Sequence, residues 1–296
     1  MRPPLVVGGG YTRSSSMLIA SASKWLYGSY VAELQAREQN GTWVLPEAEV
    51  PFLNFTSGYD NLSGRCPADQ TPTVQACLDL THGFGREKVA NGALTAADVG
   101  RFDYNSGHLE VLEAGAAPAI AQVIDKPQAD DAELAADLES TLAAHGVTVH
   151  LSFITPLPAG GIETTPGDYA AFLQGLLRAN DPLTMAYLLR PTSEDPYAVC
   201  TNPDDAVCNA VYTPVPRGVS WHYSVTHWIE DDPATGDGAY SSPGKFGFYP
   251  WIDAGKNWYG IVARFDDTKS LIKEQAPYYK SALCGEAIRK AFMTGG

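Results

Sequence analysis

Residues 17–37 carry the apolar pattern of a buried helix. In the stretch MLIASASKWLYGSYVAELQAR most side chains are apolar, and the polar sequence EQNG follows directly. We therefore predict one helix over this range, ending before that polar turn. Lys24 stands at its centre, three residues after Ser21. An ammonium group at the centre of an apolar helix calls for a specific reason.

Two further patterns divide the rest of the chain. Helical spacing marks the segments 104–124, 129–146, 165–180 and 268–293. After about residue 210, the segments GVSWHYSVTHWIED, KFGFYPWID and NWYGIVARFD are aromatic and β-branched, and turn sequences separate them. This alternation predicts an antiparallel meander, and PLVV near the N terminus is interpreted as one short strand.

The predicted fold class is α+β, with an antiparallel sheet flanked by helices and an additional helical region. The last helix follows the meander directly, whereas the other helices precede it. The predicted division is 1–37 for the first helix and a remnant of the sheet region, 38–204 for a mostly helical region, and 205–296 for the antiparallel sheet and the last helix.

Composition excludes some classes of function. The chain has 296 residues, of which 45% are hydrophobic, so it can bury a sizeable core. It contains no apolar run of the roughly 18 residues that a membrane span needs. The formal net charge is −14, which repels phosphate backbones and disfavours a nucleic-acid partner.

The cysteines form two local couples. Cys66 and Cys77 flank a turn-rich loop, and so do Cys200 and Cys208, whereas Cys284 stands alone. Short loops closed by disulfides are typical of exported proteins, so we predict these two pairs and a secreted or periplasmic location. The segment MRPPLVVGGG has no apolar leader core, so the leader is expected outside this chain. Free thiols are the alternative; a four-sulfur metal site does not fit the cysteine spacing.

Ser21 and Lys24 are candidates for nucleophilic catalysis. On a helix, side chains three residues apart are neighbours, so the Ser21 hydroxyl and the Lys24 amine can meet. Burial disfavours an ammonium, and a neutral lysine can take the proton of a serine hydroxyl. The alternative is a lysine whose amine simply reaches solvent. The same S-x-x-K spacing recurs at Ser242 and at Ser270, but neither serine lies in an apolar segment with a helical pattern.

An ordered set of motifs resembles the serine β-lactamase-related hydrolases. The set consists of IASASKWL, NFTSGYD, FDYNSGHLEVLEA, PAGGIETTPGDYAAFLQGLL and WHYSVTHWIE, followed by YSSPGKFGFYPWID and WYGIVAR. Each motif is weak alone, but together they cover residues 19 to 265 in that family's order. The branch that the chain most resembles contains class C β-lactamases, esterases and DD-peptidases. The resemblance implies a β-lactamase/transpeptidase-like fold and an acyl-enzyme mechanism.

The resemblance assigns roles to individual residues. It makes Ser21 the nucleophile and Lys24 its base, and Tyr104 of YNS takes the place of the tyrosine that relays protons. Ser106 stands where this branch has asparagine, at a position that helps to hold the lysine and a substrate amide. This departure weakens the case for a β-lactam or peptide substrate.

The third motif of the family, Lys-Thr-Gly in β-lactamases, aligns with SPG at Ser242 to Gly244. The backbone N–H of Lys245 would then form the oxyanion hole together with that of Ser21. A register three residues earlier, at AYS, is the alternative. In both registers the lysine that binds a substrate carboxylate has no counterpart, which favours neutral esters.

The chain also departs from the family before Ser21. Only 20 residues precede this serine, so strands that the family places there are expected to be reduced or missing. Such a sheet is expected to have an exposed edge and to favour self-association.

The resulting hypothesis is a carboxylesterase for small neutral esters, with no metal or organic cofactor. The alternatives are a β-lactamase or D-Ala-type peptidase acting on an amide at the same site, and a non-catalytic binding protein on the same scaffold.

Overall fold

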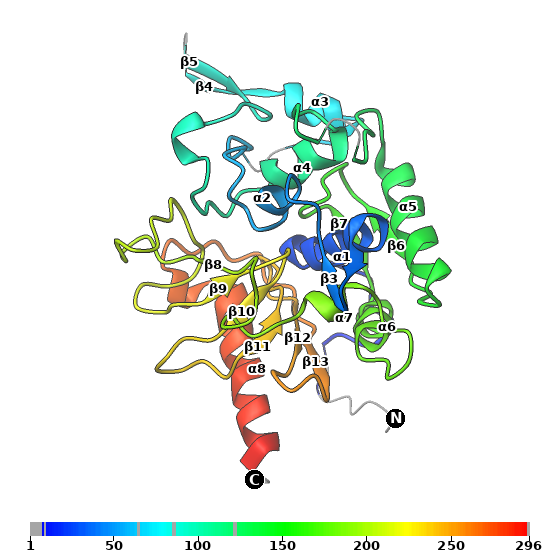
Figure 1. The fold of residues 1–296 in the computed structure, drawn as a ribbon, viewed down its shortest axis with the longest axis vertical. Helices are drawn as coiled ribbons and strands as arrows, with labels where there is room; N and C mark the ends of the chain where they lie inside the picture. Colours follow the sequence, from blue (N-terminus) through cyan, green and yellow to red (C-terminus); the bar gives the residue numbers. More distant parts are fainter. Residues whose placement is uncertain (1–7, 9, 64–65, 85–86, 121–122, 295–296) are drawn as a thin grey trace.

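The structure is a computed structural model that describes residues 8, 10–63, 66–84, 87–120 and 123–294. The strand predicted at PLVV lies outside these residues. Helix α1 (Ser23–Gln35) lies near the centre of the molecule, between a part rich in helices and a six-stranded sheet (Figure 1). The predicted α+β class, an antiparallel sheet with flanking helices and a separate helical region, is confirmed.

The predicted helix over 17–37 is shorter than expected. Strand β1 (Met17–Leu18) precedes a 3₁₀ turn (Ala20–Ala22), and only then does α1 begin. Backbone pairing of β1 with a distant strand overrides the local helical pattern at this end. At the other end Ala36 is extended, with ψ at 145°, which stops the helix before the hairpin that follows.

The main sheet is antiparallel throughout, and its strands lie in the order β13-β12-β11-β10-β9-β8. Consecutive strands are neighbours, as a meander requires. Its members are β8 (Val199–Cys200), β9 (His222–Tyr223), β10 (Trp228–Glu230), β11 (Ala239–Ser241), β12 (Tyr249–Ile252) and β13 (Tyr259–Val262). Strand β8 comes before residue 205. One short strand of the sheet therefore lies in the range 38–204, which we predicted to be mostly helical.

Helix α8 (Pro277–Thr294) packs on β12 and β13 (Figure 1). The predicted helix 268–293 therefore starts later than expected, after a 3₁₀ turn at Lys273–Gln275. Proline suits the first position of a helix, which explains why α8 begins at Pro277. The guanidinium of Arg289 is buried and ties α8 to the sheet, because it donates to Glu230 at 2.6 Å and to the Tyr249 hydroxyl at 2.7 Å.

The middle of the chain combines short helices with two hairpins. Among the described residues of the segment predicted as helical over 104–124, the helix is α4 alone, because Gly115 adopts the left-handed conformation that ends it, with φ at 61°. The elements here are the helices α2 (Val50–Leu53), α3 (Val74–Asp79), α4 (Gly107–Ala114), α5 (Asp131–Ala144), α6 (Pro166–Leu176) and α7 (Met185–Leu188), the hairpin strands β2 (Arg37–Gln39), β3 (Thr42–Val44), β4 (Thr81–Phe84) and β5 (Glu87–Ala90), and a 3₁₀ turn at Ala96–Asp98.

A small second sheet brings a distant loop to the start of α1. Strand β7 (Ile162–Thr164) pairs with β1 on one side and with β6 (Leu151–Phe153) on the other. The Ile19 amide extends this pairing by donating to the Ile162 carbonyl at 3.1 Å. The loop that connects β6 and β7, residues 154–161, is therefore held beside the 3₁₀ turn that contains Ser21.

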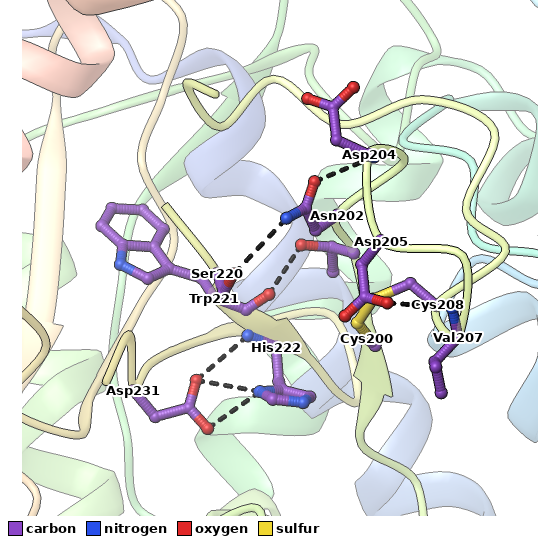
Figure 2. The surroundings of a disulfide bond; sticks show 11 residues. Cys200, Asn202, Asp204, Asp205, Val207, Cys208, Ser220, Trp221, His222 and Asp231 are labelled. Atoms are coloured by element: carbon purple, nitrogen blue, oxygen red, sulfur yellow. Dashed lines mark hydrogen bonds and ion pairs between the residues drawn. A yellow bond between two sulfur atoms is a disulfide. The ribbon is translucent and has the colours of Figure 1, made fainter. Parts of the chain in front are cut away.

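Both predicted disulfides are confirmed. Cys66 pairs with Cys77 and Cys200 with Cys208, at Cα–Cα distances of 5.3 and 5.1 Å. Cys284 is free and exposed, as expected. Figure 2 shows that the second disulfide closes a loop beside β9, where His222 pairs with Asp231. Among the described residues, no helix is both long and apolar enough to cross a membrane.

Candidate active site

Ser21 and Lys24 meet at the start of α1. The Lys24 ammonium nitrogen, Nζ, lies 3.1 Å from Ser21 Oγ. Lys24 is only 2% exposed, whereas Ser21 is half-buried between the buried residues Ala20 and Ala22. Ala20 has a φ of 46°, an uncommon left-handed conformation for alanine. Such backbone strain is frequent next to reactive groups, and here the residue directly before the candidate nucleophile carries it.

Lys24 is held in place by a second hydrogen bond. Its Nζ donates to the Ala159 carbonyl at 2.7 Å, across the loop that connects β6 and β7. Burial lowers the pKa of Lys24 from its usual 10.5 to about 7, and the charge of Glu110 opposes this by raising it. A large fraction of Lys24 is therefore a neutral amine near pH 7. A neutral amine 3.1 Å from a hydroxyl is placed to accept its proton.

Tyr104 completes this cluster. Its ring lies under the Lys24 amine, with 4.9 Å between Nζ and the ring centroid. Burial raises the pKa of Tyr104 to about 12, and a hydrogen bond with Ser21 partly opposes this rise. The group is thus a neutral phenol near pH 7. Its amide donates to the Tyr212 carbonyl at 3.0 Å, and its ring packs 5.5 Å from that of Phe55, so the phenol is held on two sides.

The turn after β11 also reaches Ser21. Ser242 Oγ donates to the Ser21 carbonyl at 3.0 Å, and only glycine fits at position 244, because a Cβ there would collide with the Ile19 carbonyl. In the alternative register, AYS, the residues are those of β11 itself, where the Ser241 hydroxyl bonds Glu230. The structure therefore brings Ser242 and Gly244, rather than AYS, beside the segment that contains the candidate nucleophile Ser21.

Two amides near this turn are available to an oxyanion. The backbone N–H groups of Ser21 and Lys245 have no recorded acceptor among the described residues. The Lys245 side chain itself is exposed. The resemblance assigns the oxyanion hole to these two amides, and this assignment stays a prediction.

Ser106 is not brought into this cluster by any recorded contact. It precedes the first residue of α4, and its hydroxyl makes no hydrogen bond to Ser21 or Lys24. Asn105, the neighbour of Tyr104, is structural, since its amide donates to the Leu62 carbonyl and its oxygen accepts from the Gly107 amide. The second partner of Lys24 is instead Ala159, which the sequence reasoning did not single out although it lies in the PAGG motif.

In the two other S-x-x-K sequences, the serine and the lysine side chains do not contact each other. Ser270 Oγ donates to the Ile272 carbonyl, and Lys273 donates to the Thr213 carbonyl, so these side chains point to different partners. Ser242 bonds Ser21, whereas Lys245 is exposed. Within the described part of the chain, only Ser21 has a lysine amine at hydrogen-bond distance from its hydroxyl.

One cluster has the donor types of a metal site. Cys200, Asp205 and Cys208 place their ligand atoms within 4.8 Å of one another. The two sulfurs are joined in a disulfide (Figure 2), and Asp205 accepts from the Val207 amide at 2.9 Å. Disulfide sulfurs are not thiolate ligands, so these residues do not fit a metal ion.

Comparison with solved structures shows which fold this is. The chain is similar to the D-amino acid amidase of Ochrobactrum anthropi SV3, with a TM-score of 0.60, 13% identity, and coverage of 96% of this chain and 86% of that one. It is similar to a β-lactamase from Mycobacterium bovis, with a TM-score of 0.51, 14% identity, and coverage of 93% and 89%. It is also similar to the octameric penicillin-binding protein homologue from Pyrococcus abyssi, with a TM-score of 0.56, 14% identity, and coverage of 96% and 67%.

Comparisons of sequence alone add nothing further. Neither a family model nor a curated protein matches this chain. At 13 to 14% identity, the similarity to these structures establishes the fold rather than the activity. The chain has the fold of the β-lactamase and penicillin-binding-protein-like serine hydrolases.

Proposed function

We propose that this protein is a serine hydrolase that forms an acyl-enzyme on Ser21, and that its substrates are small neutral esters. The observation that carries the proposal is the buried Lys24 amine, 3.1 Å from the Ser21 hydroxyl and with its pKa lowered to about 7. A lysine in this state can activate a serine without a metal or a histidine.

The proposed reaction has two steps, formation of the acyl-enzyme and its hydrolysis. The Ser21 hydroxyl gives its proton to neutral Lys24 while its oxygen bonds the ester carbonyl carbon, and the carbonyl oxygen becomes the oxyanion. The amides of Ser21 and Lys245 bind that oxyanion. The ester C–O bond then breaks, and the leaving alkoxide takes a proton that Tyr104 relays from Lys24. In the second step water gives a proton to neutral Lys24 as its oxygen bonds the acyl carbon. The bond between that carbon and Ser21 Oγ then breaks to release the carboxylic acid, and Lys24 returns the proton to the Ser21 oxygen.

Three features support an ester rather than an anionic β-lactam or peptide. The position that carries a substrate-binding lysine in β-lactamases is Ser242, whose hydroxyl is engaged by the Ser21 carbonyl. Lys245 is exposed, and its side chain makes no recorded contact with Ser21 or Lys24. Ser106 likewise offers a hydroxyl in place of an amide. None of these groups supplies a buried cation for a substrate carboxylate.

Amide hydrolysis at the same site is the second candidate. The observation that favours it is the similarity of the fold to a D-amino acid amidase and a β-lactamase. An amide needs its leaving nitrogen to be protonated, and a buried phenol such as Tyr104 could relay that proton.

A substrate panel separates these candidates. Purified protein and the variant Ser21→Ala are assayed with p-nitrophenyl esters of increasing acyl length, an amino acid amide and a chromogenic cephalosporin. We expect a higher kcat/KM for at least one short ester than for the amide and the cephalosporin. If the cephalosporin or the amide exceeds every ester, the ester proposal is wrong and the amide candidate replaces it. If no substrate is turned over and Ser21 cannot be acylated, the binding-protein alternative applies.

Tyr104→Phe is expected to lower kcat by ~10² or more, because the phenol then cannot relay the proton to the leaving group. The ring, which packs on Phe55, is kept, so the fold should be retained. Steady-state kinetics with a p-nitrophenyl ester and with an alkyl ester test this, since the poorer alkyl leaving group needs the proton more. An unchanged kcat for both esters would remove Tyr104 from the mechanism.

We also propose a secreted or periplasmic location. It is supported by the two disulfides, which form and persist in oxidising compartments. A non-reducing peptide map of protein made in an oxidising compartment should show both links. Free thiols at all four positions would contradict this location.

A further inference from the structure

A buried histidine in the first turn of α4 joins two segments that lie far apart in the sequence. His108 is 0% exposed, and both of its ring nitrogens have a partner. Nδ1 lies 2.7 Å from the Ser57 hydroxyl oxygen, and Nε2 lies 3.0 Å from the Asp103 carbonyl oxygen. Because both bonds are buried, the imidazole fixes the position of Asp103 relative to the loop that contains Ser57.

The two hydrogen bonds of His108 select one neutral tautomer of its ring. A carbonyl oxygen can only accept, so Nε2 carries the proton that is donated to Asp103. Nδ1 then has a lone pair, and the Ser57 hydroxyl donates to it. Burial lowers the pKa of His108 to about 3, and the charge of Lys24 acts in the same direction, so the ring is neutral near pH 7.

The loop that contains Ser57 also binds the other side of Asp103. This loop follows α2, which packs against α4 (Figure 1). Phe55 in this loop has a φ of 63°, an uncommon left-handed conformation for a bulky side chain, and its carbonyl accepts from the Asp103 amide at 3.0 Å. Asp103 is therefore held at its amide by Phe55 and at its carbonyl by His108. Tyr104 is the next residue of the chain.

The His108 ring also supports the side chain of Tyr104, through Phe55. The rings of His108 and Phe55 are stacked, with 5.0 Å between their centroids and an angle of 14° between their planes. The other neighbours of the Phe55 ring are Tyr104, at 5.5 Å between centroids, and Lys24 Nζ, at 6.0 Å from the centroid. His108 thus contacts both the residue that precedes Tyr104 and the ring against which the phenol packs.

We propose that His108 is a positioning residue that holds the Tyr104 phenol in place for proton transfer, and that Ser57 fixes the ring of His108. This inference rests on the proposed function, in which the phenol relays a proton to the leaving group. His108 makes no recorded contact with Ser21, so it acts through Tyr104. Proton transfer depends steeply on distance, and a displacement of about 1 Å can lower a rate by up to ~10²-fold.

The expected kinetic effect depends on the leaving group. His108→Phe keeps an aromatic ring beside Phe55 but removes both hydrogen bonds. For an alkyl ester, whose leaving group needs the proton, we expect kcat to fall by ~10-fold or more with KM little changed. For a p-nitrophenyl ester we expect a fall of less than about 3-fold, because this leaving group departs without a proton. A similar loss for both esters would overturn the proposal.

Two further variants accompany His108→Phe. His108→Gln keeps an N–H donor that can reach the Asp103 carbonyl, so it should recover part of the rate with the alkyl ester. His150→Phe is the matched control, because His150 is exposed, and it should change neither rate. An alkyl-ester rate in His108→Gln below that in His108→Phe would contradict the assigned role of the bond to Asp103.

A double-mutant cycle separates positioning from a general loss of stability. His108→Phe is made in the native protein and in Tyr104→Phe, which has no phenol to position. We expect the fold-change in kcat for the alkyl ester to be close to 1 in the Tyr104→Phe background. Loss of folded protein would instead lower kcat by the same factor in both backgrounds. Equal fold-changes would therefore overturn the proposal.

Two nuclear magnetic resonance spectra test the arrangement without a substrate. In protein with ¹⁵N-labelled histidine, the His108 signals are assigned by their loss in His108→Phe. They should show the tautomer protonated at Nε2, and Ser57→Ala should shift the Nδ1 signal. In protein with ¹³C-labelled tyrosine, the Tyr104 signal, assigned by its loss in Tyr104→Phe, should move in His108→Phe but not in His150→Phe. A ring protonated at Nδ1 alone, or an unmoved Tyr104 signal, would overturn the proposal.

Failure of this inference is distinguishable from failure of the proposed function. Ester turnover that His108→Phe leaves unchanged would overturn the positioning role while the proposed function stands. A protein without esterase activity that gives the expected spectra would reject the proposed function and support the arrangement around Tyr104. If His108→Phe does not fold, Ser57→Ala and His108→Gln take its place, and each should slow the alkyl ester more than the p-nitrophenyl ester.

Discussion

Ser21→Ala is expected to lower kcat for ester hydrolysis by ~10⁴-fold or more, because Ser21 is the one nucleophile of the proposed mechanism and no other group replaces it. The change should leave the surrounding site intact. Lys24 keeps its bond to the Ala159 carbonyl, and Ser242 keeps its acceptor, since that acceptor is the backbone carbonyl of residue 21. The loss should therefore appear in kcat, with the melting temperature close to that of the native protein.

The measurement is single-turnover and steady-state kinetics with the best ester of the panel. Ser242→Ala serves as a matched control, because it removes a hydroxyl at the same site that the account does not acylate. A Ser21→Ala protein that retains more than a small fraction of kcat would show that another group attacks the substrate.

Lys24→Met is expected to lower kcat by ~10³-fold while it stabilises the fold. Methionine keeps the length and the apolar stem of the lysine but cannot accept a proton. In the native protein, kcat/KM should rise with pH through a midpoint near 7, because burial lowers the pKa of Lys24 to about 7 and only the neutral amine is a base. This rise should be absent from the residual activity of the variant.

The stability effect has a definite sign. The pKa of Lys24 is lower in the folded chain than in the unfolded chain, so between about 7 and the usual 10.5 the unfolded chain binds more protons. The free energy of unfolding of the native protein should therefore increase as the pH rises through this window. Below about pH 7 this increase is absent, and the native protein is less stable by that amount. Lys24→Met has no such dependence, so its advantage in melting temperature should be largest below pH 7 and shrink toward pH 10. Thermal melts across this range test the sign; a variant that melts lower than the native protein at pH 6 would contradict it.

The local part of the site could be predicted from the sequence. Ser21 and Lys24 are three residues apart in one apolar segment, so helical geometry alone brings them together. The cysteines of the two disulfides are separated by 11 and 8 positions in the sequence, and the loops between them are rich in turn residues, so each cysteine has few alternative partners. Tyr104 lies far from Ser21 in sequence, and its placement came from the order of motifs rather than from any local pattern.

The remaining features depend on long-range packing. Ala159 reaches Lys24 only because β7 pairs with β1, and that pairing also shortens the predicted helix at 17–37. Helical periodicity does not show that Glu110 is fully buried, since glutamate usually lies on an exposed helix face. Ser106 was predicted at the site from its place in a motif, but the backbone turns at the start of α4 and the structure records no contact between its hydroxyl and Lys24.

Covalent labelling with a fluorophosphonate tests directly whether Ser21 is the nucleophile. The folded protein is treated with the reagent, its intact mass is recorded, and the modified residue is located by peptide mapping, with Ser21→Ala and heat-denatured protein as controls. We expect one adduct per chain, on Ser21, absent from both controls and formed more slowly in Lys24→Met. An adduct on Ser242 or Ser270, or no adduct on folded native protein, would contradict it.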